Sequence, residues 1–137
     1  MAAVNFSGKW KEVRSENKEV LFAAMKLPEE VIKMYGAMKP TMEITHNGDE
    51  IQMKTMNDGV IIKEDKFTVG VRFTPKVPAG VPEEDYIASW EDGGKVLRTK
   101  NASKENGLVI DQKIDNGEVV VVETLGDVVA TLFYAKV

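Results

Sequence analysis

The sequence contains no cysteine in its 137 residues. This absence excludes a fold held together by disulfide bonds, a thiolate metal site and a thiol nucleophile. Histidine occurs once, as His46, which leaves little basis for a Ser-His-Asp site or an imidazole metal centre. No apolar run approaches the roughly 20 residues of a membrane-spanning helix, and the first residues lack the apolar segment of a signal peptide. We therefore expect a cytoplasmic protein with no cofactor and no metal.

The charge balance argues against nucleic acid as a partner. The formal net charge is −4, whereas phosphate binding requires a surplus of basic residues on one face. Hydrophobic residues make up 43% of the chain, enough to build a core, and the length fits a single domain covering residues 1–137. We expect this domain to be a monomer.

Two short helices are predicted near the start of the chain, after a first strand in the segment 4–14. The first has Val20, Leu21, Ala24 and Met25 at helical spacing. The second begins at Pro28, which suits a first helical turn, and it ends before Pro40 because the residue preceding a proline is pushed out of the helical region.

The rest of the chain has the pattern of β-strands. Turn signals such as Asn47-Gly48, Asp58-Gly59 and Asn116-Gly117 recur at intervals of about ten residues, which is typical of an antiparallel barrel or sandwich. Three prolines within the segment 75–82 predict a long loop. The predicted strands are Thr41–His46, Ile51–Met56, Val60–Lys66, Thr68–Thr74, Tyr86–Trp90, Val96–Asn101, Leu108–Ile114, Glu118–Thr124 and Val128–Lys136.

With the first strand, this pattern gives ten strands and one pair of helices inserted after the first of them. We predict an all-β fold, a ten-stranded antiparallel up-and-down barrel with a helix-turn-helix lid between the first two strands. A closed barrel removes the edges of its sheet, and one of this size is too wide to be filled by side chains alone. The sequence therefore predicts an internal cavity with a helical cover.

A series of short motifs is distributed along the whole chain. They are Phe6-Ser7-Gly8-Lys9-Trp10, Ser15-Glu16-Asn17, Leu27-Pro28-Glu29-Glu30, Asn47-Gly48-Asp49, Phe67-Thr68-Val69-Gly70, Asp92-Gly93-Gly94-Lys95, Gly126-Asp127-Val128-Val129 and Tyr134-Ala135-Lys136-Val137. In their order and spacing these motifs resemble the intracellular fatty-acid-binding proteins, with some features of the liver-type branch. The resemblance implies the same barrel and lid, an internal cavity for lipid and no catalytic activity. Lys18 departs from it, because the family usually has an aromatic residue there.

The resemblance also implies a site deep in the barrel, where family members often hold a carboxylate with two arginines and a tyrosine. The corresponding positions are Gln112, Leu132 and Tyr134, so only the tyrosine is retained. Gln112 is similar to the cellular retinol-binding proteins, in which glutamine meets a neutral hydroxyl group. A carboxylate in a low-dielectric cavity is costly without a charged partner.

Arg98 and Lys100 are candidates to supply the missing positive charge. They share the parity that the family points inward on this strand, and Glu123 is expected to face inward and to pair with one of them. The alternative is a strand shifted by one residue, which turns both cations to solvent.

The remaining candidate ligand contacts are apolar or small. On the second helix, Val31, Met34 and Tyr35 are expected to line the portal or to pack the lid. The nearby lysines, Lys18, Lys26 and Lys33, are interpreted as solvated surface, with transient membrane contact through the lid as the alternative. The other expected lining residues are Met53, Thr55, Phe73, Ile110 and Val121.

The function predicted from these observations is an intracellular carrier that reversibly binds a long-chain fatty acid or a similar hydrophobic ligand. The alternatives are a carrier of a retinoid, sterol or bile acid, a barrel that serves as an interaction module, and a lipid-modifying enzyme. No nucleophile elbow, zinc-binding helix motif or phosphate-binding loop is present, so the chain is not expected to be an enzyme.

Overall fold

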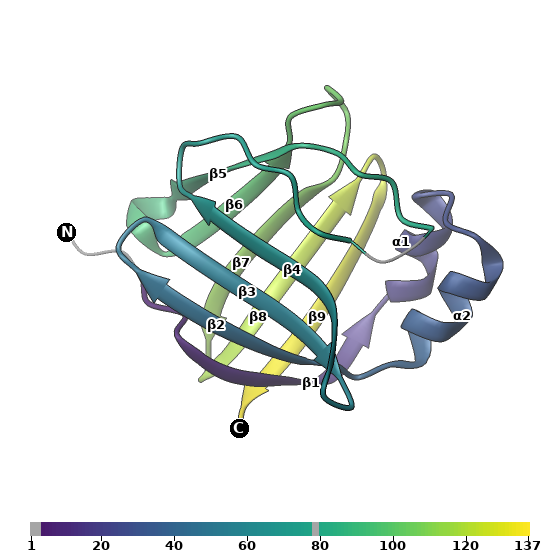
Figure 1. The fold of residues 1–137 in the computed structure, drawn as a ribbon, viewed down its shortest axis with the longest axis horizontal. Coiled ribbons are helices and arrows are strands. Elements are labelled where there is room, and N and C mark those ends of the chain that lie inside the picture. Colours follow the sequence, from purple (N-terminus) through teal and green to yellow (C-terminus); the bar gives the residue numbers. More distant parts are fainter. Residues whose placement is uncertain (1–3, 78–79) are drawn as a thin grey trace.

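The computed structural model describes residues 4–77 and 80–137, in which one nearly closed antiparallel sheet wraps around an interior (Figure 1). The strands follow the neighbour order β4-β3-β2-β1-β9-β8-β7-β6-β5. Consecutive strands therefore pair with one another except β4 and β5, which form the two edges of the sheet, and β1 also pairs with β9. The strands are β1 Gly8–Glu16, β2 Thr41–Asn47, β3 Glu50–Asn57, β4 Val60–Thr68, β5 Tyr86–Glu91, β6 Val96–Asn101, β7 Val109–Asp115, β8 Glu118–Leu125 and β9 Val128–Lys136.

Two helices, α1 Lys18–Ala24 and α2 Glu29–Ala37, connect β1 to β2 and cover one end of the barrel (Figure 1). Pro28 is the N-cap of α2, and Glu29 and Glu30 in its first turn favour the helix dipole. In the part of the chain that the structure describes, neither helix has the length and apolar character to cross a membrane. The predicted barrel with a helix pair between its first two strands is confirmed.

Short hairpin turns fix the register of the strands. Asp58-Gly59 joins β3 to β4, Asn116-Gly117 joins β7 to β8, and all four of these residues have positive φ. Two-residue turns of this kind match the right-handed twist of the flanking strands, and Asn-Gly or Asp-Gly adopts them at little cost. The two turns predicted from these dipeptides are therefore confirmed, and the backbone preferences of the dipeptides explain why.

The prediction of a tenth strand at Thr68–Thr74 is wrong. The chain turns after β4, where Gly70 has a φ of +89°. In place of a continuous ladder, the described residues of this region make two isolated bridges, Glu64 with Lys76 and Phe73 with Tyr86, and single backbone hydrogen bonds such as that from Gly70 to Ala88. Proline, which cannot donate a backbone hydrogen bond, occurs at Pro75 and Pro82 in the predicted loop, while Pro78 lies outside the described residues. The barrel therefore has a seam between β4 and β5.

Aromatic side chains pack along this seam. The ring of Phe73 stacks on Phe67 at 4.5 Å between centroids and lies 6.4 Å from Tyr86 at a tilted angle. Phe67 belongs to β4 and Tyr86 to β5, so these side chains connect the two strands, together with the backbone hydrogen bonds between Phe73 and Tyr86.

A buried aromatic group lies in the core, outside the cavity described below. His46 stacks with both Phe6 and Trp90, with centroid distances of 6.0 and 5.6 Å, and the rings of Phe6 and Trp90 are 6.5 Å apart. Its Nδ1 accepts a hydrogen bond from the backbone N–H of Phe6 and its Nε2 lies 2.8 Å from the carbonyl oxygen of Gly48, so the proton is on Nε2. His46 is therefore buried and takes part in core packing.

Candidate functional site

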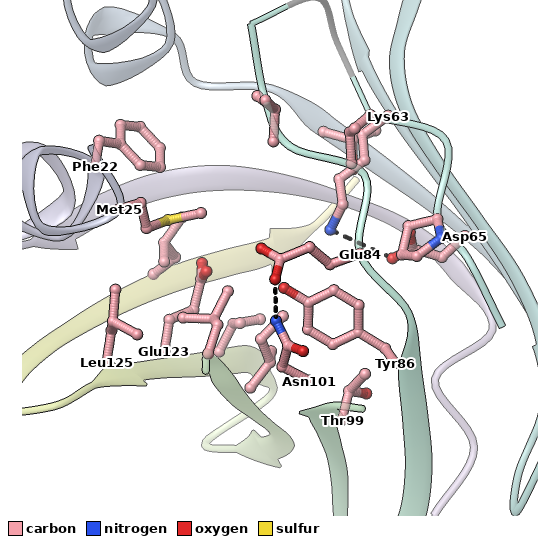
Figure 2. Close-up of a pocket in the computed structure, with 18 of the residues that line it drawn as sticks. Phe22, Met25, Lys63, Asp65, Glu84, Tyr86, Thr99, Asn101, Glu123 and Leu125 are labelled. Carbon is pink, nitrogen blue, oxygen red and sulfur yellow. Dashed lines mark hydrogen bonds and ion pairs between the residues drawn. The ribbon is translucent and has the colours of Figure 1, made fainter. Parts of the chain in front are cut away.

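An internal cavity of about 470 Å³ lies between the inner face of the sheet and the two helices. Its volume is within the range of roughly 300–1,000 Å³ found for small-molecule sites. Figure 2 shows part of its wall, including residues of α1, β4, β5, β6 and β8. The residues expected from the sequence that the structure places in the wall are Tyr35, Met53, Thr55, Phe73, Ile110, Gln112, Val121, Glu123, Leu132 and Tyr134.

The three positions singled out by the family resemblance lie close together. Gln112 is the register partner of Val121, and Val121 is the partner of Leu132, so these side chains form one row across β7, β8 and β9. Tyr134 follows two residues after Leu132 on the same face. Gln112 is only 4% exposed, and its Nε2 has no hydrogen-bond partner among the described residues.

This row carries no positive charge. Leu132 offers only apolar surface, and the phenol of Tyr134 is buried. Burial, together with the carboxylates of Glu12 and Glu123, raises the pKa of Tyr134, so its hydroxyl group stays neutral. The row can offer a ligand hydrogen bonds from neutral groups but no ion pair.

The prediction that Arg98 and Lys100 point inward is wrong. The intervening residue, Thr99, is buried and lines the cavity, whereas Lys100 is exposed. Arg98 forms a bidentate ion pair with Asp111 on the neighbouring strand, in which Nε and Nη2 donate to the two carboxylate oxygens at 2.8 and 3.0 Å. The two residues are register partners, so the pair fixes both on the outer face, and the predicted pairing of Glu123 with either cation does not occur.

The second helix presents a different face from the predicted one. Tyr35 lines the cavity, as does Met38 at the end of the helix. Met34 is 50% exposed and does not line the cavity. Val31 is buried but lies outside the cavity wall, near Gly80 of the loop before β5. The expectation that Met34 and Val31 line the cavity is therefore wrong. Helix α2 lies over the rim with only one edge turned inward.

Sequence reasoning missed a buried ion pair below the helices. Nζ of Lys18 donates to both carboxylate oxygens of Glu12 at 2.9 Å and to the backbone oxygen of Met38 at 2.8 Å. Glu12 is 2% exposed and Lys18 is 7% exposed, so the interpretation of Lys18 as solvated surface is wrong. Lys26 and Lys33 are exposed, as expected. The one signal in the sequence was Lys18 itself, at a position where the family usually has an aromatic residue.

A second interior pair was also missed. On β4, Nζ of Lys63 lies 3.4 Å from a carboxylate oxygen of Asp65, and both side chains line the cavity (Figure 2). The nearby carboxylates of Asp65 and Glu123 raise the pKa of Lys63 despite its burial, so it stays protonated. The other oxygen of Asp65, Oδ1, is buried and has no hydrogen-bond partner among the described residues.

At the rim, the polar contacts involve the loops next to β5 and β6. The carboxylate of Glu84 lies 3.4 Å from Nζ of Lys104 and accepts a hydrogen bond from Nδ2 of Asn101 at 3.1 Å (Figure 2). Burial raises the pKa of the neighbouring Tyr86. This part of the rim is therefore polar, and the charges of Glu84 and Lys104 are matched.

Comparisons with known proteins agree with this architecture. Residues 7–127 match the model of the lipocalin / cytosolic fatty-acid binding protein family. The chain is 31% identical to the cellular retinoic acid-binding protein 2 of Mus musculus, over 96% of this chain and 98% of that protein. It is 28% identical to the liver fatty acid-binding protein of Sus scrofa, over 85% of this chain and 94% of that protein.

Among solved structures, lipid binding protein 8 of Caenorhabditis elegans superposes with a TM-score of 0.85 at 20% identity, covering 100% of this chain and 99% of that one. Fatty-acid-binding protein 1 of Echinococcus granulosus gives 0.84 at 22% identity, covering 96% and 97%. At this identity the superpositions establish the fold. The fold, the family match and the relatives agree, and the chain belongs to the lipocalin and cytosolic fatty-acid-binding protein family.

Proposed function

We propose that this protein is a non-catalytic carrier that reversibly binds a hydrophobic molecule, such as a long-chain fatty acid or a similar lipid, inside the barrel. The observation that carries the proposal is the internal cavity of about 470 Å³. Its lining combines apolar side chains with a few polar groups, as is usual for sites that bind small molecules. Each methylene group that moves from water into such a cavity contributes about 0.8 kcal/mol to binding.

A second candidate is a carrier of a retinoid, sterol or bile acid. It is favoured by Gln112 and Leu132, which stand where family members often have arginines. A neutral hydroxyl group of a ligand can accept a hydrogen bond from the amide of Gln112, which has no protein partner in the described structure. The two candidates share the cavity and differ in the polar group of the ligand.

Displacement of a fluorescent fatty-acid analogue from the delipidated protein tests the carrier function. We expect the analogue to bind with micromolar or better affinity, and oleate, retinol or a bile acid to displace it. Arg98→Met is the control, because Arg98 lies outside the cavity and its loss should leave affinity unchanged. If no lipid of any of these classes binds, the carrier proposal is wrong and the barrel is better explained as an interaction module.

A further inference from the structure

The charged side chains of the cavity wall are almost all matched in pairs. Glu12 pairs with Lys18, Asp65 with Lys63, and Glu84 with Lys104 at the rim. Two charged wall residues make no ion pair in the described part of the chain, Lys26 and Glu123. Lys26 is exposed to solvent at the end of α1, so its charge is hydrated from outside. Glu123 is the unmatched charge of the interior.

Glu123 lies in the middle of the wall. It is on β8, opposite Ile110 of β7 and Ala130 of β9. Figure 2 shows its side chain between Leu125 and Tyr86, with the carboxyl group pointing into the cavity. It makes no side-chain hydrogen bond with the residues that the structure describes, and it is a partly buried residue of the cavity wall.

The groups around Glu123 do not provide a counter-charge for its carboxylate. Burial raises the pKa of Glu123, and the carboxylates of Glu12 and Asp65 act in the same direction. The ammonium groups of Lys63 and Lys18 oppose the shift, but each is held by its own carboxylate. An ionised Glu123 therefore has no counter-charge of its own among the described wall residues, because its nearest cation, Lys63, is paired with Asp65.

Gln112 gives an independent indication of a ligand group at the same place. It is the register partner of Val121 and lies two residues along β7 from Ile110, so it is a diagonal neighbour of Glu123 on the inner face. Its amide nitrogen is buried and has no partner in the described chain. The wall thus presents a carboxylate that can only accept when ionised and an amide that donates.

The net charge of the side chains inside the rim favours a cationic ligand over an anionic one. With all groups ionised, the carboxylates of Glu12, Asp65 and Glu123 exceed the ammonium groups of Lys18 and Lys63 by one. A bound carboxylate would add a second unmatched negative charge in a site of low dielectric constant. A bound cation would bring the interior to neutrality, and a buried charge is tolerated when it is paired in this way.

We propose that the cavity selects a long-chain lipid with a protonated amino group, which pairs with Glu123 while a neighbouring hydroxyl group of the lipid accepts a hydrogen bond from Gln112. This inference rests on the proposed carrier function and specifies its ligand. The apolar chain of the lipid would extend along the apolar wall formed by Phe22, Met25 and Leu125 on the other side of Glu123 (Figure 2).

The test compares oleylamine, oleyl alcohol and oleate, which share one chain and differ in charge, by titration calorimetry. We expect oleylamine to bind at least tenfold more tightly than oleate. Glu123→Gln should weaken oleylamine about tenfold to a hundredfold, as expected for loss of a charge-assisted hydrogen bond, and should leave oleyl alcohol unchanged. The matched control is Glu105→Gln, because Glu105 is exposed and does not line the cavity.

The pH dependence gives a second readout. As pH rises through the titration of Glu123, affinity for oleylamine should rise and affinity for oleate should fall, and both trends should disappear in Glu123→Gln. Urea unfolding of each variant verifies that it is folded. The other ionisable groups near Glu123, which remain in every variant, are Glu12, Lys18, Lys63, Asp65, Tyr86 and Tyr134.

The outcomes separate the two proposals. If oleyl alcohol and oleate bind but oleylamine binds no more tightly than the alcohol, the amine inference is wrong and the carrier function stands. Unchanged affinity of Glu123→Gln for oleylamine would also overturn the inference. If none of the three ligands binds to the folded parent protein, the carrier function itself fails.

Discussion

Replacing Lys18 with methionine should leave the carboxylate of Glu12 buried without a partner. In the parent protein, the three protons of the ammonium group meet three oxygens at 2.8–2.9 Å, two on Glu12 and one on Met38. The substitution retains most of the apolar stem and removes all three hydrogen bonds. Because Glu12 is only 2% exposed, water does not replace them.

Removing one partner of a buried ion pair typically costs about 3–5 kcal/mol, so we expect Lys18→Met to lower the free energy of unfolding by that amount. For a chain of this length the midpoint of thermal unfolding should fall by roughly 10–17 °C. Urea unfolding followed by tryptophan fluorescence measures the change. Lys33→Met is the control, because Lys33 forms an exposed pair with Glu29 at 3.6 Å and such pairs contribute about 0.5 kcal/mol or less.

A double variant tests the reasoning behind this magnitude. Glu12→Leu combined with Lys18→Met replaces the pair with apolar side chains, and such replacements are often neutral or stabilising. We expect the double variant to be more stable than either single variant. The argument would be refuted if Lys18→Met behaved like Lys33→Met, or if the two single effects simply added in the double variant.

Three further predictions concern the cavity. Gln112→Leu should stabilise the ligand-free protein by about 1 kcal/mol in urea unfolding, because it removes a buried donor without a partner; a destabilised variant would contradict this. Since burial raises the pKa of Glu123, its contribution to stability is complete below the unfolded pKa and is lost as pH rises through the folded pKa. Glu123→Gln should therefore gain stability relative to the parent as pH rises above the unfolded pKa, and a difference that does not change with pH would refute the assignment. Tyr35→Glu should weaken binding of a fluorescent fatty-acid analogue more than Met34→Glu, because Tyr35 lines the cavity and Met34 is exposed; equal effects would disprove the helix orientation.

Local chemistry explains which parts of the fold could be predicted from the sequence. Asp58-Gly59 and Asn116-Gly117 carry their turn geometry in their own backbone preferences, so the hairpins they join were predictable. The segment Thr68–Thr74 has the composition of a strand, but its pairing depends on distant partners. Gly70 turns the chain and the following prolines limit hydrogen bonding, so composition alone gave the wrong structure there.

The same distinction applies to the candidate site. The inward positions of Gln112 and Leu132 followed from the alignment of recognisable motifs, whereas Arg98 and Lys100 depended on strand parity alone. Both parities of β6 mix polar and apolar residues, and the outer face is fixed by Asp111 on a different strand. The ion pair between Glu12 and Lys18 was missed because Glu12 lies on β1 and Lys18 on α1. Neither the two-residue period of a strand nor the 3.6-residue period of a helix predicts a contact between the two elements.

The position of β1 has a consequence for folding. This strand lies between β2 and β9 and pairs with residues more than 100 positions later, for example Lys11 with Ala135. Closure of so long a loop is entropically costly and slow. During synthesis, β1 can pair with β2 early, but the ladder with β9 must wait until Lys136 has left the ribosome. We therefore expect shortened chains that end before Val128 to retain an unsatisfied edge on β1 and to be prone to aggregation.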